Sequence, residues 1–171
     1  MIRLEPISPA NALVFKAVRL RALQTDPSAF GSTFAKESAF PDEEWLRRAV
    51  RWSSEGFFAC LALDQENPCG LVGCYIEEDP EFAHVVSMWV DPAYRRSGVG
   101  CALIGELKAW ASARHLRALK LMVTSVNPGA LRFYERLGFS KTGRTGPYPN
   151  DPAVFEIEMM LELIPGPSRL P

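Results

Sequence analysis

The sequence has little of the chemistry that holds a metal ion or a disulfide framework. Its 171 residues include four cysteines and two histidines, and they form no CxxC pair and no paired Cys/His spacing of the kind that zinc sites use. Cys60, Cys74 and Cys101 lie within apolar segments, and Cys69 lies in an expected turn. We therefore expect no metal, and we expect reduced thiols that pack as small core residues.

Long apolar runs are missing too. The longest, residues 57–63, is far shorter than the roughly 20 residues that a membrane-spanning helix needs. The chain begins Met-Ile-Arg-Leu-Glu-Pro, without the basic stretch and apolar stretch of a secretory signal. We expect a cytoplasmic location and no membrane partner.

Net charge is nearly absent, but the balance conceals an asymmetry. The formal charge is −1, whereas residues 91–145 hold ten Lys/Arg and three Asp/Glu (net +7) and residues 41–90 hold three and ten (net −7). A basic half suits an anionic partner, although charges also cluster by chance. Nucleic acid is not favoured, because no basic stripe with interleaved aromatic residues is present.

What the chain does have is an ordinary globular composition. It is 47% hydrophobic and shows no repeat, low-complexity run or linker. A domain of this length buries roughly two-thirds of its unfolded surface and needs no staples. We predict one domain over residues 1–171, with residues 164–171 as a flexible tail.

The hydrophobic periodicity predicts alternating strands and helices. We expect strands at 2–7, 57–63, 71–77, 83–90, 119–123, 139–142 and 154–163. We expect helices at 9–24, from Pro41, at 98–115, and from Asn127 to a stop at Gly138, with a loop over 26–40. Short turns between the second, third and fourth strands indicate an antiparallel meander. The prediction is a mixed α/β sheet with helices on both faces.

The most informative segment reads Val85-Val-Ser-Met-Trp-Val-Asp-Pro-Ala-Tyr-Arg-Arg-Ser-Gly-Val-Gly100. A strand ends at Asp91-Pro92, and a loop with two arginines then enters a helix through glycines. Backbone N–H groups at a helix N-terminus, together with the positive end of the helix dipole, form a site for a pyrophosphate. We expect glycine there because a Cβ would hold a phosphate away from the backbone. The patterns GxxxxGK[ST] and GxGxxG are both absent.

A second segment follows the helix: Val123-Thr-Ser-Val-Asn127-Pro-Gly-Ala130-Leu-Arg-Phe-Tyr134-Glu-Arg-Leu-Gly-Phe139. Together, the RxxGxG run after a Val-Asp-Pro strand end and this Asn-x-x-Ala-x-x-x-Tyr pattern resemble the GCN5-related N-acetyltransferase (GNAT) family. The resemblance covers about residues 55–163. It implies the GNAT fold, a mostly antiparallel sheet of about seven strands with one splayed strand pair, and it implies acetyl-CoA as cosubstrate.

The resemblance also implies roles for individual residues. The strand ending at Val90 would carry a bulge and separate from the strand at 119–123, and the pantetheine arm would lie between them. Backbone groups of Met88, Trp89 and Val90 would bind that arm. The pyrophosphate would take the amides of Arg95, Arg96, Ser97, Gly98, Val99 and Gly100. Asn127 would lie beside the cofactor, and Tyr134 matches the frequent general acid. The residues alone leave plainer alternatives: Asn127 as a helix N-cap, Tyr134 and the Trp89 ring as core.

The general base is where the sequence departs from many relatives, which often place a glutamate on the strand before the Val-Asp-Pro turn. Residues 84–90 contain no carboxylate. Ser87 is a candidate to hold a water that relays the proton. More remote candidates are Glu37, Glu78, Glu81 and His84, and the base stays open.

The acceptor site is expected between the loop at 26–40 and the loop at 143–152. Phe30, Glu37 and Tyr148 are the candidate acceptor contacts, in an apolar pocket with some negative charge that suits a small amine or a peptide N-terminus. The alternative is that these side chains only pin the loops. The acidic turn around Glu77 to Glu81 suggests a cationic acceptor.

Two function classes stay open. The first is an N-acetyltransferase that moves an acetyl group directly from acetyl-CoA to an amine. The second is an acyl-CoA-binding sensor or interaction module without turnover, which the missing strand glutamate keeps in consideration. Homodimers are frequent in this fold, so a homodimer is a further expectation by analogy.

Overall fold

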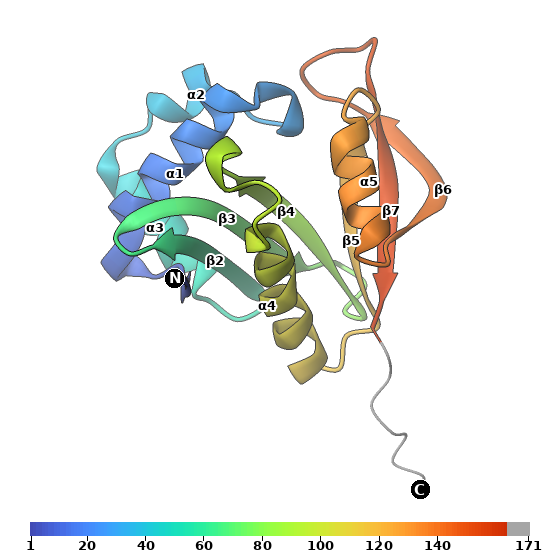
Figure 1. Cartoon of the computed structure of the whole chain (residues 1–171), viewed down its shortest axis with the longest axis horizontal. Helices are drawn as coiled ribbons and strands as arrows, with labels where there is room; N and C mark the ends of the chain where they lie inside the picture. Colours follow the sequence, from blue (N-terminus) through green and yellow to red (C-terminus); the bar gives the residue numbers. More distant parts are fainter. Residues whose placement is uncertain (164–171) are drawn as a thin grey trace, which may run out of the picture.

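One seven-stranded sheet organises the protein, with strand order β1-β2-β3-β4-β5-β7-β6 (Figure 1). The computed structural model describes residues 1–163, and the expected flexible tail at 164–171 lies outside the described residues. All neighbouring strands are antiparallel except the parallel pair β4–β5. The strands are β1 (Ile2–Pro6), β2 (Phe57–Asp64), β3 (Asn67–Ile76), β4 (Phe82–Val90), β5 (Ala118–Thr124), β6 (Ser140–Pro147) and β7 (Phe155–Glu162).

The helices cover both faces of the sheet, as the periodicity predicts. One face carries α1 (Ala12–Thr25), α2 (Phe34–Ser38) and α3 (Asp42–Trp52), and the other carries α4 (Val99–Ala113) and α5 (Pro128–Arg136) (Figure 1). Short 3₁₀ turns lie at η1 (Pro9–Asn11), η2 (Pro27–Ala29) and η3 (Pro92–Tyr94). The mixed, mostly antiparallel sheet of seven strands is therefore confirmed.

The two layers of helices bury separate hydrophobic clusters. Leu103, Ile104 and Leu107 of α4 pack on alternate residues of β2 to β5 and β7. Phe15, Val18 and the fully buried Trp45 of α1 and α3 pack on the opposite residues of β2 to β4. Period-two alternation along each strand therefore assigns a side chain to one cluster or the other.

The structure corrects four expectations of local structure. The loop at 26–40 contains the helix α2, which Thr33 caps by accepting from the Lys36 amide. The expected turn before residue 71 is shorter, because Asn67 already pairs with Asp64 and β3 starts there. β6 extends to Pro147, past residue 142. Cys101 is exposed rather than core, whereas Cys69 is buried in β3, as are Cys74 in the same strand and Cys60 in β2.

Within residues 1–163, none of the helices is long and apolar enough to cross a membrane. The same residues contain no group of three or more His, Cys, Asp or Glu side chains placed to hold a metal ion.

Candidate functional site

The sheet opens between β4 and β5. These strands pair at only three positions, from Phe82–Ala118 to His84–Lys120, and then spread apart toward their C-terminal ends (Figure 1). β5 continues to Thr124 against β7 on its other side. The backbone groups of β4 that would face β5 beyond His84 are therefore available to a ligand.

A bulge marks the middle of the separated part of β4. Gly73 pairs with Val86 and Leu71 pairs with Trp89, so three steps along β4 oppose two along β3. Ser87 takes up the extra residue with φ +58°, which is unusual for a residue other than glycine. The bulge turns the chain just before Met88, where the resemblance implies cofactor contacts.

A groove of about 850 Å³ begins at this opening. Its lining includes nine of the eleven residues expected to bind the cofactor: Met88, Trp89, Val90, Arg95, Arg96, Gly98, Gly100, Asn127 and Tyr134. The side chains of the other two turn elsewhere: the Ser97 hydroxyl donates to the Tyr94 carbonyl, and Val99 is buried in the core. Their backbone amides belong to the same helix entrance, so their role stays a prediction.

Much of the α5 side of the groove consists of residues that were not among the predicted cofactor contacts. Lining residues there include Gly129, Ala130, Arg132, Phe133, Arg136 and Leu137. Arg132 and Arg136 are one helical turn apart and so lie on one helix face. Two arginines four residues apart, next to the Asn127–Tyr134 pattern, are the feature of the sequence that could have predicted this side of the groove.

The helix entrance at one end of the groove has the geometry of an anion site. Arg96 has φ +64° and Gly98 has φ +93°, and left-handed residues beside ordinary ones turn successive N–H groups to one side. The first N–H groups of α4 have no partner within the helix. A Cβ on Gly98 would meet nothing within 4 Å, so the positive φ, rather than steric contact within the protein, favours glycine here.

Gly100 is required for a different reason. A Cβ there would lie 2.9 Å from Cζ of Phe133 and 3.3 Å from Cε of Met88, and both neighbours line the groove. The close approach of α4 to α5 therefore depends on the missing side chain. Packing, in addition to room for a phosphate, explains the glycine.

Arginines make the groove electropositive. Arg95, Arg96, Arg132 and Arg136 all line it. The guanidinium of Arg95 donates to Asp26 Oδ2, and the same oxygen accepts from Trp89 Nε1 at 2.7 Å. The Trp89 ring is 4% exposed and packs with the α1–α3 cluster, so the ring is core and only its backbone is available to a ligand.

Tyr134 lines the groove while most of its ring is in the core. It is 7% exposed and makes edge contacts with Phe133 and Phe139. Burial raises the pKa of its hydroxyl, so the group is protonated at neutral pH and able to donate. Asn127 Oδ1 accepts from the Ala130 amide at 3.1 Å, which confirms the N-cap, and Asn127 also lines the groove.

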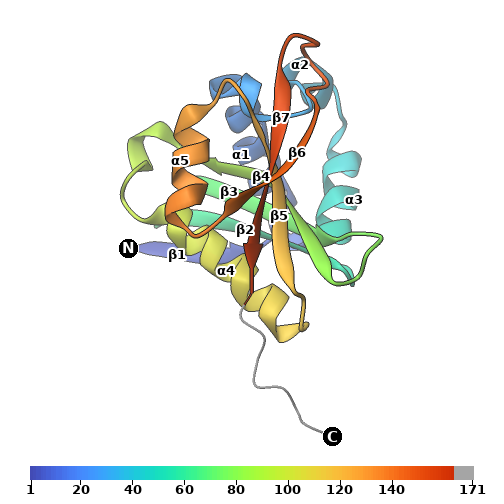
Figure 2. The same ribbon diagram turned by 90° about the vertical axis from the view of Figure 1, so that its right-hand side faces the viewer.

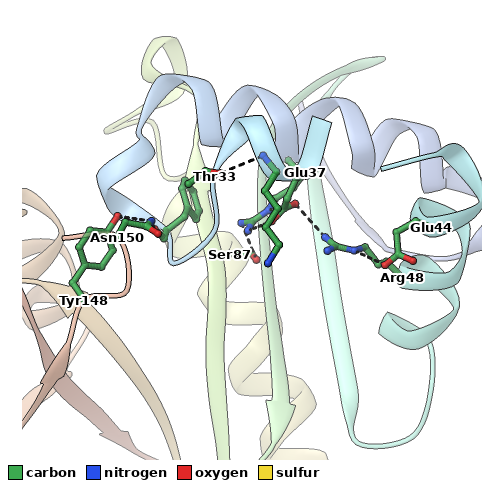
Figure 3. Close-up of polar contacts among 10 residues, drawn as sticks. Thr33, Glu37, Glu44, Arg48, Ser87, Tyr148 and Asn150 are labelled. Carbon is green, nitrogen blue, oxygen red and sulfur yellow. Dashed lines mark hydrogen bonds and ion pairs between the residues drawn. The ribbon is translucent and has the colours of Figure 1, made fainter. Parts of the chain in front are cut away.

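Behind the bulge lies a buried ion network that the sequence analysis did not foresee (Figure 3). Ser87 Oγ accepts from Arg19 Nη1 at 3.3 Å, and Arg19 forms two hydrogen bonds to the Glu37 carboxylate, at 2.8 and 3.1 Å. Arg48 donates to the same carboxylate at 3.1 Å and also binds Glu44. The sequence feature that could have predicted this network is Arg19, which lies four residues after the buried Phe15 and four before the buried Leu23 and therefore on the buried face of the helix.

This network settles the protonation of Glu37. Burial alone would raise the pKa of the carboxyl group, but hydrogen bonding and charge from Arg19, with help from Ser32 and Arg48, outweigh it and lower the pKa. Both oxygens are occupied and the residue is 2% exposed. Glu37 is therefore an ionised structural carboxylate and is poorly suited to remove a proton or to contact an acceptor.

The other two expected acceptor contacts hold the loops together. Tyr148 Oη donates to the Phe30 carbonyl at 2.8 Å, and Asn150 Nδ2 donates to the same oxygen at 3.0 Å (Figure 3). Phe30 and Tyr148 are 5% and 6% exposed. The geometry thus favours the alternative in which these side chains pin the loops.

The acidic turn between β3 and β4 lies where β4 and β5 are still paired, away from the opening. Glu77 binds His84 Nδ1 at 3.2 Å and Lys120 at 3.5 Å, and Glu81 binds Arg117 at 2.9 Å. The charges of Glu77 and Glu81 are therefore compensated in place, whereas Glu78 is exposed and forms no ion pair within residues 1–163. The position of the turn does not favour the expectation that it attracts the acceptor, nor a base role for Glu78, Glu81 or His84.

Comparisons with known proteins agree with this geometry. The model of the acetyltransferase (GNAT) family matches residues 20–139. An uncharacterised N-acetyltransferase of Methanocaldococcus jannaschii is 33% identical over 111 residues, which cover 60% of this chain and 48% of that protein. The chain spans about half, or less, of the length of the first curated relatives it matches.

Solved structures share the fold. A GNAT acetyltransferase from Streptococcus pneumoniae superposes with a TM-score of 0.80 at 20% identity, covering 95% of this chain and 99% of that one. The protein yncA of Salmonella typhimurium, whose structure holds its cofactor acetyl-CoA, gives a TM-score of 0.79 at 14% identity, covering 99% and 98%. With the family model matching well over half of its length, the chain belongs to the GNAT acetyltransferase family.

Proposed function

We propose that this protein transfers an acetyl group from acetyl-CoA directly to the nitrogen of an amine. The observation that carries the proposal is the groove between the separated strands, with unpaired helix N–H groups and arginines at one end and Tyr134 along its wall. The donor set suits a long anionic ligand: a pyrophosphate at the α4 entrance and an amide-rich arm along β4. The thioester supplies an activated acetyl carbon.

The chain's own residues then have three tasks. Backbone groups of β4 near the bulge hold the thioester, and an N–H there is positioned to meet the oxyanion. The Tyr134 hydroxyl protonates the departing thiolate, a step typically worth 10²–10⁴-fold in rate. The walls of the opening align amine and thioester, and such proximity supplies a large part of the remaining rate enhancement.

The cofactor half of the proposal is tested by calorimetry. Arg132→Glu with Arg136→Glu should weaken acetyl-CoA binding at least tenfold, because two groove cations become anions. Lys108→Glu is the matched control, because Lys108 is exposed on α4 and outside the groove. Equal weakening in both proteins would show that the groove is not the binding site.

The reaction is tested by screening primary amines, amino acids and peptide N-termini for release of free thiol from acetyl-CoA. Saturable release that depends on one acceptor class supports the enzyme. Tight binding without release in any class supports the second candidate function, an acyl-CoA-binding module, which the absence of a carboxylate on β4 keeps in consideration.

A further inference from the structure

An acyl transfer to an amine needs a group that removes a proton, and the expected candidates do not supply it. Free alkylamines are mostly protonated near neutrality, since a lysine side chain has a pKa of about 10.4. Glu37 is bound by two guanidiniums, and the other candidates, Glu78, Glu81 and His84, lie at the closed end of the β4–β5 pair. The following inference rests on the proposed function and concerns β7, on the far side of the opening.

Glu156 on β7 lies on the sheet face opposite α4 and α5. Its strand alternates, and Met159 and Leu161 point into the cluster beneath α4 and α5, so Glu156 and Glu158 take the other face. Across that face Glu156 is paired with Thr124 of β5 and Gly146 of β6. Gly146 adds no side chain to that row, and the Met122 side chain occupies the space over it, with Cε 3.3 Å from the position of an added Cβ.

Glu156 also lies at the open end of the sheet. Its partner Thr124 is four residues past Lys120, the last residue of β5 to pair with β4. Thr124 Oγ1 donates to the Ser28 carbonyl at 3.2 Å, which fixes this end of β5 to the 26–30 loop. Glu156 therefore sits beside the loops expected to border the acceptor. Figure 2 shows the β5–β7–β6 wing with α5 on one side and α2 and α3 on the other.

Glu78 is exposed and forms no ion pair within residues 1–163, whereas Glu156 is partly buried and also lacks a partner there. Within residues 1–163 its side chain forms no ion pair and accepts no hydrogen bond, although it is partly buried. Burial raises the pKa of its carboxyl group, and no neighbouring charge contributes to that shift. On the same face, the charged groups of the surrounding strands are Lys120 on β5, Arg144 on β6, and Glu158 and Glu162 on β7, while Arg19 and Asp26 belong to α1 and its C-cap.

Three of those groups are already engaged. Lys120 binds Glu77, Arg19 binds Glu37, and Asp26 binds Arg95. Glu158 accepts from Thr142 Oγ1 at 2.7 Å. Arg144 on β6 forms no ion pair within residues 1–163, so a cationic ligand entering between the loops would meet Glu156 with Arg144 as an unpaired cation on the neighbouring strand.

We propose that Glu156 binds the ammonium group of the acceptor and takes its proton before the attack. The N–H proton moves to a carboxylate oxygen, leaving a neutral amine and a protonated Glu156. The amine lone pair then forms the C–N bond, the C–S bond breaks, and the sulfur leaves as a thiolate that Tyr134 protonates. The resulting Tyr134 phenolate regains a proton from the new amide nitrogen. Glu156 releases its own proton to solvent, which accounts for the one proton produced per turnover.

The first test does not require turnover. In protein saturated with coenzyme A, the side-chain carboxyl carbons of labelled glutamates are followed by NMR as butylammonium chloride is added, and Glu156→Gln assigns the resonance. We expect Glu156 to titrate above an ordinary glutamate and to shift on addition of the amine. If the chemical shift of the Glu156 carboxyl carbon does not change when the amine is added, the proposal is overturned.

The second test uses the best acceptor of the screen. Glu156→Gln should lower kcat/KM by about 10²-fold, in the range of general-base effects, and should abolish the acidic limb of the pH profile. Glu158→Gln is the matched control and should keep that limb. Retention of the limb in Glu156→Gln overturns the proton-transfer role. If the amine shifts the Glu156 resonance but wild type releases no thiol with any amine, the ammonium site is supported and acetyl transfer is what fails.

Discussion

Replacing Glu37 by glutamine is the most demanding perturbation for the network behind the bulge. The change keeps the shape of the side chain but removes the charge that two guanidiniums share. Removing one partner of a buried ion pair costs about 3–5 kcal/mol. Arg19 is 11% exposed, whereas Arg48 is 30% exposed and keeps Glu44. The loss should therefore fall near the lower end, about 3 kcal/mol.

That loss converts to a melting temperature. In a domain of 150–250 residues, 1 kcal/mol shifts Tm by roughly 2–4 °C, so Glu37→Gln should melt about 6–12 °C below wild type by calorimetry at pH 7. Glu135→Gln, which removes an exposed partner of Lys141, is the control and should leave Tm unchanged. A drop of less than about 2 °C in Glu37→Gln would refute the reasoning.

The pH dependence gives the same prediction an independent check. The folded-state pKa of Glu37 is lowered from its usual 4.5, so its ionisation contributes stability above that value and loses it as the pH falls through the lowered folded pKa. The stability gap between wild type and Glu37→Gln should be full at pH 7 and should narrow below about pH 4.5. A gap that is the same at pH 7 and pH 3.5 would mean that packing, rather than charge, is lost.

Two further predictions concern the groove. Tyr134→Phe should lower kcat about 10²-fold with little change in acetyl-CoA affinity, since it removes only the proton donor; equal turnover in a stably folded variant would reduce Tyr134 to a packing residue. Gly100→Ala should raise the KM for acetyl-CoA severalfold, because the added Cβ displaces the Phe133 ring into the groove, and an unchanged KM would show that the ring moves away instead.

Much of the fold could be predicted from the sequence because local patterns and global structure agree. Alternation and helical spacing gave seven strands and the long helices, and Gly138, with φ +95°, ends α5 as its position suggests. α2 escaped prediction because five residues are too few for a periodic apolar stripe. Pro68 and Gly70 suggested a turn, but a register shift after Ala62 lets β3 continue through them.

The candidate site likewise has one part that could be predicted from the sequence and one part that could not. The groove residues lie in two contiguous motifs, so spacing along the chain brings them together. The residues proposed to border the acceptor come from α1, β4, β7 and two loops, and only tertiary contacts bring them together. Nothing in the sequence near Arg19 or Glu156 indicates that the charge of Arg19 is compensated by Glu37 while Glu156 has no partner within residues 1–163.

The loop after α1 contacts both the proposed cofactor groove and the loops proposed to border the acceptor, so a change in it affects both. Its first residue, Asp26, holds Arg95 and the Trp89 ring, and within four residues Ser28 and Phe30 accept from β5 and from the β6–β7 loop. Exchanging this loop to alter the proposed acceptor site would also remove the contact of Asp26 with Arg95 at the proposed pyrophosphate site. Variants selected on new amines should therefore be assayed for acetyl-CoA affinity as well, and compensating substitutions are to be sought at Arg95 before they are sought among the loop residues themselves.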